Sequence, residues 1–171
     1  MLSPKIKYCP NCGTRLEVQV HENRPRDFCP ACRRIHYQQL KVGAGGIIEQ
    51  DGKLLLLQRT GQPFKGDWNL PAGYVEADEN PRQTVIREVL EEIGLEVEID
   101  GLLDVYFFQD DPRGNGILVV FRCRITGGEH TASDEADAYR YFARDELPVQ
   151  LAGGGHNQAI TAWQQDGSVP K

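Results

Sequence analysis

Long apolar runs are absent from this sequence, and its first residues, Met1 to Lys5, have no apolar core of the kind found in a signal peptide. A membrane span needs about 18 or more consecutive apolar residues. We therefore expect a soluble, cytoplasmic protein that does not contact a membrane. The 171 residues, 40% of them hydrophobic, are enough for one packed domain and a small additional module.

Basic residues become scarce after residue 41. Residues 1–41 carry eight Lys and Arg against three Asp and Glu, a formal charge of +5, whereas the remainder carries eleven against 22, or −11. Such a break predicts two modules, which we place at residues 1–38 and 39–171. An acidic main domain repels polyanions, so we do not expect nucleic acid to be a partner. Whether the protein forms a homodimer stays open at this point.

Cysteine is also sparse, but four of the five cysteines are paired. Cys9 with Cys12 and Cys29 with Cys32 form two Cys-x-x-Cys motifs that are separated by 16 residues. Four thiolates at this spacing favour a tetrahedral zinc ion with no open position, so we interpret the site as a structural zinc ribbon. Disulfides or unrelated thiols are the alternatives, and disulfides are rare in the cytoplasm. Cys123 lies in an apolar strand and is expected to be a buried thiol.

The ribbon has a basic character that two interpretations explain. Its arginines can contact nucleic acid or a protein partner, or they can form a solvated face that docks onto the acidic domain. We favour the second interpretation because charge runs are usually solvated. The residues concerned are Arg24, Arg26, Arg33 and Arg34.

A helix is predicted over residues 81–93. Asn80 is a good N-cap, Pro81 suits the first helical position, Gln83 can complete a capping box, and Gly94 can end the helix. At about 100° per residue, two groups of side chains separate. The apolar side carries Val85, Ile86, Val89, Leu90 and Ile93, and the other side carries Glu88, Glu91 and Glu92.

Three glutamates one turn apart repel one another, so the helix would be more stable without them. A positive charge must offset the repulsion, and a hard divalent cation with oxygen ligands is the simplest candidate. Glu88 and Glu92, four residues apart, are the best pair of ligands, and Glu91 is a candidate for a further ion. A solvated acidic face is the alternative.

The glutamates belong to a longer pattern, which favours the metal. It comprises Gly73, Glu79, Arg87, Glu88, Val89, Glu91, Glu92, Gly94 and Leu95. This order and spacing match the Nudix box without a departure, and residues 41–171 resemble the Nudix hydrolases. The resemblance implies an α/β/α sandwich with a mixed sheet, here preceded by the zinc ribbon. It also implies hydrolysis of a diphosphate linkage that depends on Mg²⁺ or Mn²⁺.

The resemblance implies a role for each residue of the box. Metal ligands would be Glu88, Glu91, Glu92 and the carbonyl of Ala72, while Arg87 would orient a glutamate and Gly73, Glu79 and Gly94 would support the box. Glu91 and Glu135 are the candidates for the catalytic base, and a metal ligand is the other role that the resemblance implies for Glu135. Glu135 lies in a polar loop before a late strand, and the alternative for it is an exposed loop acid.

The remaining elements follow from alternation and turn signals. Strands are expected over residues 42–50 and 53–59, joined at Asp51-Gly52, and a last helix over residues 156–165. Further strands are expected over residues 95–99, 102–109, 117–125 and 139–143. The glycines at positions 43, 45 and 46 would leave space on the sheet for substrate.

Four aromatic residues near the expected site are candidates for holding a base, and core packing is the alternative for them. They are Phe64, Trp68, Tyr106 and Phe108. A zinc ribbon before a Nudix domain is similar to NADH pyrophosphatases and to a shorter group of ADP-ribose and FAD pyrophosphatases. The Ser-Gln-Pro-Trp-Pro-Phe-Pro run of the former is missing between residues 101 and 145. The shorter group is therefore the better match.

The expected reaction releases AMP from ADP-ribose, FAD or an ADP-sugar. A nucleoside triphosphate or NADH pyrophosphatase is one alternative. A Nudix-fold nucleotide sensor and an RNA-binding regulator are alternatives of another class. The complete series from Arg87 to Leu95 argues against a sensor, which need not keep all three glutamates.

Overall fold

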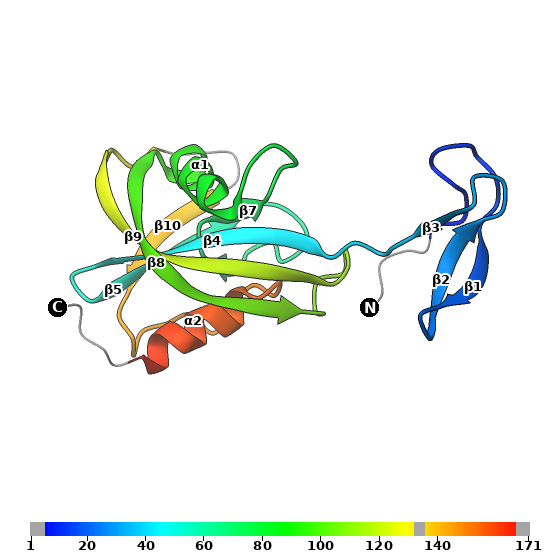
Figure 1. The fold of residues 1–171 in the computed structure, drawn as a ribbon. Helices are drawn as coiled ribbons and strands as arrows, with labels where there is room; N and C mark the ends of the chain where they lie inside the picture. Colours follow the sequence, from blue (N-terminus) through cyan, green and yellow to red (C-terminus); the bar gives the residue numbers. More distant parts are fainter. Residues whose placement is uncertain (1–5, 132–135, 167–171) are drawn as a thin grey trace.

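The computed structural model describes residues 6–131 and 136–166, which form a small sheet followed by a large mixed sheet with a helix on each face (Figure 1). This arrangement confirms the predicted α/β/α sandwich preceded by a ribbon. Glu135 lies outside the described residues. Among those residues, no helix is both long enough and apolar enough to cross a bilayer.

The small sheet has the antiparallel order β1-β2-β3. Its strands are β1 (Glu17–His21), β2 (Arg24–Cys29) and β3 (Arg34–His36). Glu22 and Asn23 join the first two strands, and both have a positive φ. In Figure 1 this sheet lies beyond the amino-terminal end of β4.

The large sheet has the order β10-β5-β4-β9-β8. Its strands are β4 (Lys41–Gln50), β5 (Lys53–Arg59), β8 (Leu95–Phe108), β9 (Gly116–Gly128) and β10 (Ala136–Phe142). The short strands β6 (Trp68–Asn69) and β7 (Ala72–Tyr74) pair with β5 and β4. Strands β4 and β9 pair in parallel, whereas the other pairs of neighbouring strands are antiparallel, so the sheet is mixed.

Turn chemistry explains two features of this sheet. Asp51 and Gly52 have φ values of 52° and 74°, which is the conformation that a tight hairpin between β4 and β5 requires. The two strands expected over residues 95–99 and 102–109 are one strand, β8. Gly101 lies at an irregularity in its pairing with β9 and does not end it, so the prediction of a break was wrong.

Alternating side chains of β5 supply the cores on both faces of the sheet. Leu55 and Leu57 pack under helix α1 (Pro81–Ile93), whereas Leu54 and Leu56 pack against helix α2 (His156–Gln165). The last helix has the predicted bounds, and it buries Ala159, Ile160 and Trp163. Cys123 is buried in the first core, as predicted.

Helix α1 begins and ends as its sequence predicts. Asn80 accepts hydrogen bonds from the main chain of Arg82 and Gln83, the Gln83 side chain completes the capping box, and Gly94 ends the helix with a φ of 74°. The predicted apolar side is partly wrong. Val85, Val89 and Ile93 are buried, but Ile86 and Leu90 are 42% and 50% exposed. Glu92 is buried in their place.

The glycines of β4 allow close packing between elements. A side chain at Gly45 would lie 2.9 Å from the Cβ of Ala72 on β7, and one at Gly46 would lie 3.3 Å from Val85 of α1. The predicted space for substrate is therefore filled at both positions. Gly43 is different, because it lines a cavity.

Candidate functional site

The four cysteines of the ribbon lie together. Their sulfur atoms are all within 4.8 Å of one another, and in the described part of the chain they are the one such group of three or more His, Cys, Asp or Glu. Each motif turns sharply just after its second cysteine, where Gly13 and Arg33 have φ values of 72° and 54°. The main-chain N–H of Cys32 also donates to the sulfur of Cys29. Four soft ligands in one cluster fit a closed zinc site.

The second site begins where β7 passes beside α1. Pairing with β4 positions β7, and Gly73 lies opposite Ala44. A Cβ atom on Gly73 would overlap the carboxylate of Glu88, so a residue without a side chain is required here. The glycine at the start of the Nudix-like pattern thus allows the carboxylate of Glu88 to reach the main chain of β7.

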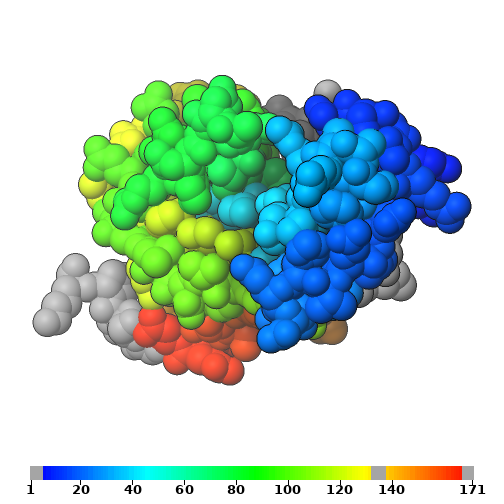
Figure 2. All heavy atoms as spheres, turned by 45° about the vertical axis from the view of Figure 1, so that its right-hand side comes forward, coloured from blue at the N-terminus to red at the C-terminus, as the bar shows by residue number. Residues whose placement is uncertain are grey.

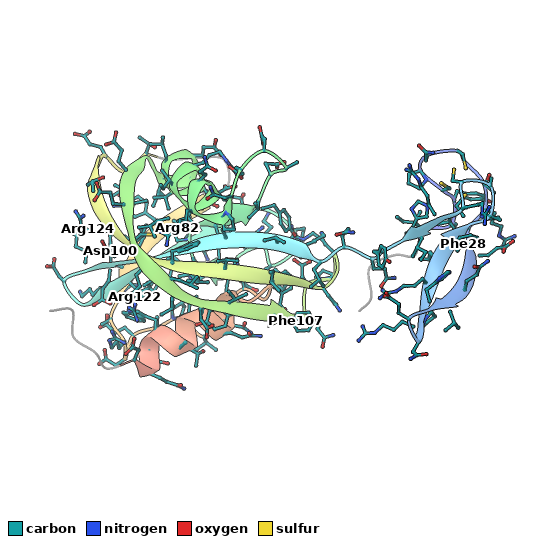
Figure 3. All side chains as sticks on the ribbon, viewed as in Figure 1. Phe28, Arg82, Asp100, Phe107, Arg122 and Arg124 are labelled. Carbon is teal, nitrogen blue, oxygen red and sulfur yellow. The ribbon has the colours of Figure 1, made fainter. Side chains whose placement is uncertain are left out.

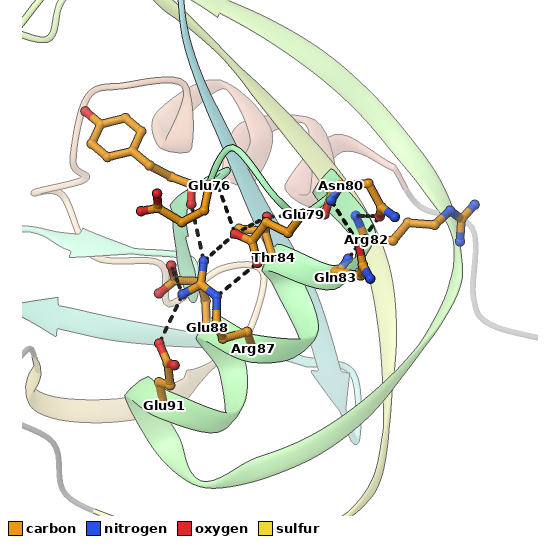
Figure 4. Close-up of polar contacts among 10 residues, drawn as sticks. Glu76, Glu79, Asn80, Arg82, Gln83, Thr84, Arg87, Glu88 and Glu91 are labelled. Carbon is orange, nitrogen blue, oxygen red and sulfur yellow. Dashed lines mark hydrogen bonds and ion pairs between the residues drawn. The ribbon is translucent and has the colours of Figure 1, made fainter.

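Arg87 is the centre of the polar network on α1 (Figure 4). Its Nη2 and Nε atoms donate to the two carboxylate oxygens of Glu79, at 2.5 and 3.1 Å. Its Nη1 atom lies 2.7 Å from Glu88 and 3.0 Å from Glu91. Nη2 also donates to the carbonyl of Tyr74. One guanidinium therefore offsets the repulsion among the acidic residues before any ion is considered.

Glu79 is held in its charged form by this network. Hydrogen bonds from Arg87, and then one from the main chain of Glu76, lower the pKa of Glu79 to about 2. The same ion pair raises the pKa of Arg87. Thr84 donates a further hydrogen bond to Glu79. The loop before α1 is thus held to the helix by an ion pair that stays charged over the whole physiological range of pH.

Glu92 lies on the buried side of the helix together with Val85 and Val89, although helical periodicity places it opposite the apolar residues. It is only 5% exposed, and its carboxylate accepts a hydrogen bond of 2.9 Å from the main-chain N–H of Ala72. A buried carboxylate needs such a partner, and β7 supplies one. The exposures of the neighbouring glutamates differ as well, at 12% for the side chain of Glu88 and 59% for that of Glu91.

These groups line a cavity of about 340 Å³. Glu88, Glu91 and Glu92 form its acidic wall, and Ala72 and Gly73 form the adjoining edge. Figure 2 shows the face on which β4 (cyan) and β9 (yellow) are visible between α1 and β8 (both green). The structure therefore brings together the predicted metal ligands that it describes on the wall of one cavity.

A second wall of the same cavity carries cations and a histidine. Its residues Arg59, Phe64, Arg113 and His156 come from the end of β5, the loop that follows β5, the loop between β8 and β9, and the start of α2. Burial, followed by the charges of Arg59 and Arg113, lowers the pKa of His156 to about 3. His156 is therefore neutral near pH 7.

Arg113 is held by Asp111, which is buried. The guanidinium donates to both carboxylate oxygens, at 2.7 to 3.1 Å, and its Cζ atom lies 5.3 Å from the centre of the Tyr74 ring. Burial alone would raise the pKa of Asp111, but the hydrogen bonds from Arg113 outweigh it and lower the pKa. This pair was not predicted from the sequence. Its only signal was the turn Asp110-Asp111-Pro112-Arg113, which also suits an ordinary loop.

The four aromatic candidates divide into two groups. Phe64 and Phe108 line the cavity. Trp68 instead packs edge-on against Phe142 at 4.8 Å, and Tyr106 packs against the core beneath α2. The structure thus brings two of the four to the cavity, and the alternative of core packing describes Trp68 and Tyr106.

The donor set fits a hard divalent ion. Mg²⁺ keeps several of its waters and uses few carboxylates from the protein, so it does not require the tight cluster that the cysteines form. Glu88 and Glu92 are a buried or nearly buried pair on one wall, and Glu91 is the exposed neighbour. These oxygen ligands disfavour a soft metal.

Family models match almost the whole chain. The model of the NUDIX domain matches residues 38–164, and the model described as Nudix N-terminal, a zinc ribbon, matches residues 7–38.

Two of the curated relatives are named for different enzyme activities. The ADP-ribose pyrophosphatase of Methanocaldococcus jannaschii is 43% identical over 113 residues, which are 66% of this chain and 67% of that protein. The NAD-capped RNA hydrolase NudC of Pseudomonas aeruginosa is 33% identical over 143 residues, which are 83% of this chain and 49% of that protein. The chain thus spans about half the length of that NudC relative.

Solved structures show the same fold. A NUDIX hydrolase of Nitrosomonas europaea superposes with a TM-score of 0.81 at 32% identity, covering 95% of this chain and 92% of that one. An ADP-ribose pyrophosphatase of Streptococcus suis has a TM-score of 0.62 at 28% identity, covering 78% of this chain and 96% of that one.

Proposed function

Because the chain belongs to the Nudix hydrolase family, we propose that it cleaves the diphosphate linkage of a nucleoside diphosphate joined to another group. ADP-ribose is the expected substrate, FAD and ADP-sugars are the next candidates, and AMP is one product. The observation that carries this proposal is that Glu88, Glu91 and Glu92 share one cavity wall beside Ala72. The name of the 43% identical relative supports the choice of ADP-ribose.

Glu88 and Glu92 would hold the ion, together with the carbonyl of Ala72, and Mg²⁺ or Mn²⁺ is the expected metal. When bound, the metal would neutralise phosphate charge and acidify a water molecule. The N–H of Ala72 keeps the buried carboxylate of Glu92 in position. Gly73 leaves room for Glu88 at the edge of β7.

Arg87 positions the other acidic groups. Its contacts to Glu79, Glu88 and Glu91 fix three carboxylates around one planar cation. Glu91 is the exposed member and would accept a proton from the attacking water or bind a second ion. Glu135 stays the other candidate for the base.

The ribbon would contain one structural zinc ion held by Cys9, Cys12, Cys29 and Cys32. Four thiolates leave no position for substrate, so this zinc would stabilise the fold without taking part in catalysis. Residues 1–38 and 39–171 would accordingly form two modules.

A second candidate function is hydrolysis of an NAD-linked substrate, which the similarity to NudC favours. The missing Ser-Gln-Pro-Trp-Pro-Phe-Pro run argues against it. The acidic main domain argues further against a substrate attached to a long RNA.

The test is a panel of ADP-ribose, FAD, NADH, ADP-glucose, dinucleoside polyphosphates and nucleoside triphosphates, with Mg²⁺ and with Mn²⁺. We expect ADP-ribose to have the highest kcat/KM, with AMP as a product. NADH in first place would support the second candidate, and triphosphates in first place would contradict both. Binding of ADP-ribose without turnover of any compound would indicate a sensor.

A further inference from the structure

Arg59 differs in its ion pairs from the two other arginines that line the cavity. Arg87 pairs with three carboxylates and Arg113 pairs with Asp111. In the described part of the chain Arg59 has no carboxylate partner, and its side chain donates one hydrogen bond, from Nε to the carbonyl of Pro63 at 3.3 Å. Its Nη1 and Nη2 atoms, which carry four N–H donors, are left for another acceptor.

The position of Arg59 indicates that these donors face a ligand site. The residue ends β5 and lines the same cavity as the glutamates of α1, but on the wall that α1 does not form. Arg59 is half-buried at this concave wall, and a guanidinium that loses part of its contact with water is stabilised by pairing with an anion. An anionic ligand group in this cavity is the partner that the wall lacks.

His156 adds a neutral hydrogen-bonding group to this wall. Its Nδ1 atom is buried and has no hydrogen-bond partner in the described protein, and the ring lines the cavity. A neutral imidazole can donate to or accept from a hydroxyl group without adding charge. The two residues together offer donors for a phosphate and a partner for a sugar hydroxyl.

The loop that follows β5 contributes Phe64 to this wall. Phe64 has a φ of 69°, and its ring lies against Gly153, where an added Cβ would be 2.7 Å from Cζ. The cavity of about 340 Å³ is near the small end of the roughly 300–1,000 Å³ that is usual for ligand sites. A compact sugar fits this size better than a large planar ring system.

We propose that Arg59 and His156 form a subsite for a sugar phosphate, which binds the half of the substrate that is not the nucleoside monophosphate. This inference rests on the proposed function, because it assigns the second half of the diphosphate substrate to this wall. The subsite selects ADP-ribose and ADP-sugars over FAD. The planar, forked guanidinium is suited to the two oxygens of one phosphate.

Direct binding tests the subsite without turnover. The full chain with its zinc, and without added divalent ions, is titrated calorimetrically with ribose 5-phosphate, inorganic phosphate and ribose. We expect ribose 5-phosphate to bind most tightly, and Arg59→Gln to weaken it about 10- to 100-fold, as for the loss of charged hydrogen bonds. Arg59→Lys should recover part of the affinity. Equal binding by wild type and Arg59→Gln, or tighter binding of ribose than of its phosphate, would overturn the proposal.

Kinetics give the second readout. With ADP-ribose, Arg59→Gln should raise KM at least tenfold and leave kcat within about threefold, because the residue binds the substrate and does not touch the reacting water. A fall in kcat with unchanged KM would contradict the subsite. The matched control is Arg124→Gln, an exposed arginine on β9 that pairs with Glu98 (Figure 3) and should leave both constants unchanged.

The two failures can be told apart. If wild type hydrolyses no compound of the panel, the proposed function fails, and the titration with ribose 5-phosphate alone decides the subsite. If wild type hydrolyses ADP-ribose and Arg59→Gln behaves like Arg124→Gln in both assays, the subsite fails and the proposed function stands. Unchanged zinc content and thermal midpoint in Arg59→Gln would show that the variant is folded.

Discussion

The carboxylate of Glu88 occupies the space in which a side chain on Gly73 would lie. Adding a single methyl group would therefore force this carboxylate, the Arg87 network or β7 to move. The contact links the start of the Nudix box to its helix, although fifteen positions separate the two residues in the sequence. It also explains physically why a glycine with an ordinary φ is required here.

Gly73→Ala should lower activity on ADP-ribose at least tenfold and destabilise the fold by roughly 1–3 kcal/mol, the range for an overpacked position. Gly61→Ala is the matched control, since no atom would lie within 4 Å of its added Cβ. Activity assays and urea unfolding of both variants provide the measurement. Wild-type activity in Gly73→Ala would show that Glu88 can move without consequence.

Glu92→Gln should reduce turnover by roughly 10² or more, several kcal/mol of barrier, because the amide keeps an acceptor for Ala72 but removes the charge that holds the ion. The free energy of unfolding should change by less than about 1 kcal/mol. Glu98→Gln, an exposed change on β8, is the control. Near-normal turnover in Glu92→Gln would mean that the buried carboxylate is structural and not a metal ligand.

Glu79 should make stability depend on acid. Its pKa is lowered from the ordinary 4.5 to about 2, so its contribution is complete above pH 4.5 and is lost as the pH falls toward 2. Glu79→Gln should therefore be less stable than wild type at pH 7, and the difference should shrink between pH 4.5 and pH 2. Urea unfolding at pH 7, 4 and 2.5 measures it. A difference independent of pH would exclude the ion pair with Arg87 as its cause.

Purified protein should contain about one zinc per chain that survives dialysis. Cys9→Ser should lose this zinc and unfold the ribbon, whereas Cys123→Ser, which changes a thiol outside the cluster, should keep it. Elemental analysis together with alkylation of native protein checks both variants. Absence of zinc with all four ribbon thiols reactive would contradict the assignment.

The ends of α1 were predictable because each depends on local chemistry. Asn80, Gln83 and Gly94 act on neighbouring main-chain groups, and such signals are fully contained in the sequence. The side of the helix that is buried was not predictable in this way. It is set by β7, which places the N–H of Ala72 beneath Glu92 and leaves Ile86 and Leu90 exposed.

The sequence alone also left open which positive charge offsets the repulsion among the glutamates. A divalent ion is the simplest candidate from their spacing, and the structure adds that Arg87, from within the same helix, contacts Glu88 and Glu91. The direction in which the Arg87 side chain points could not be inferred from helical periodicity, because it depends on the loop that brings Glu79 back to the helix.

The cations of the second wall come from separate loops and strands, so no local sequence pattern predicted that they would lie together.

The contacts of Arg87 imply that the two proposed metal sites would be filled in opposite ways. A chelator should empty the acidic wall without melting α1, because the internal guanidinium keeps the carboxylates in place. Removing zinc should instead unfold the ribbon, because its small sheet depends on the metal for its stability. The divalent ion at the acidic wall would bind reversibly, as a substrate does. The zinc ion would be incorporated once, when the chain folds.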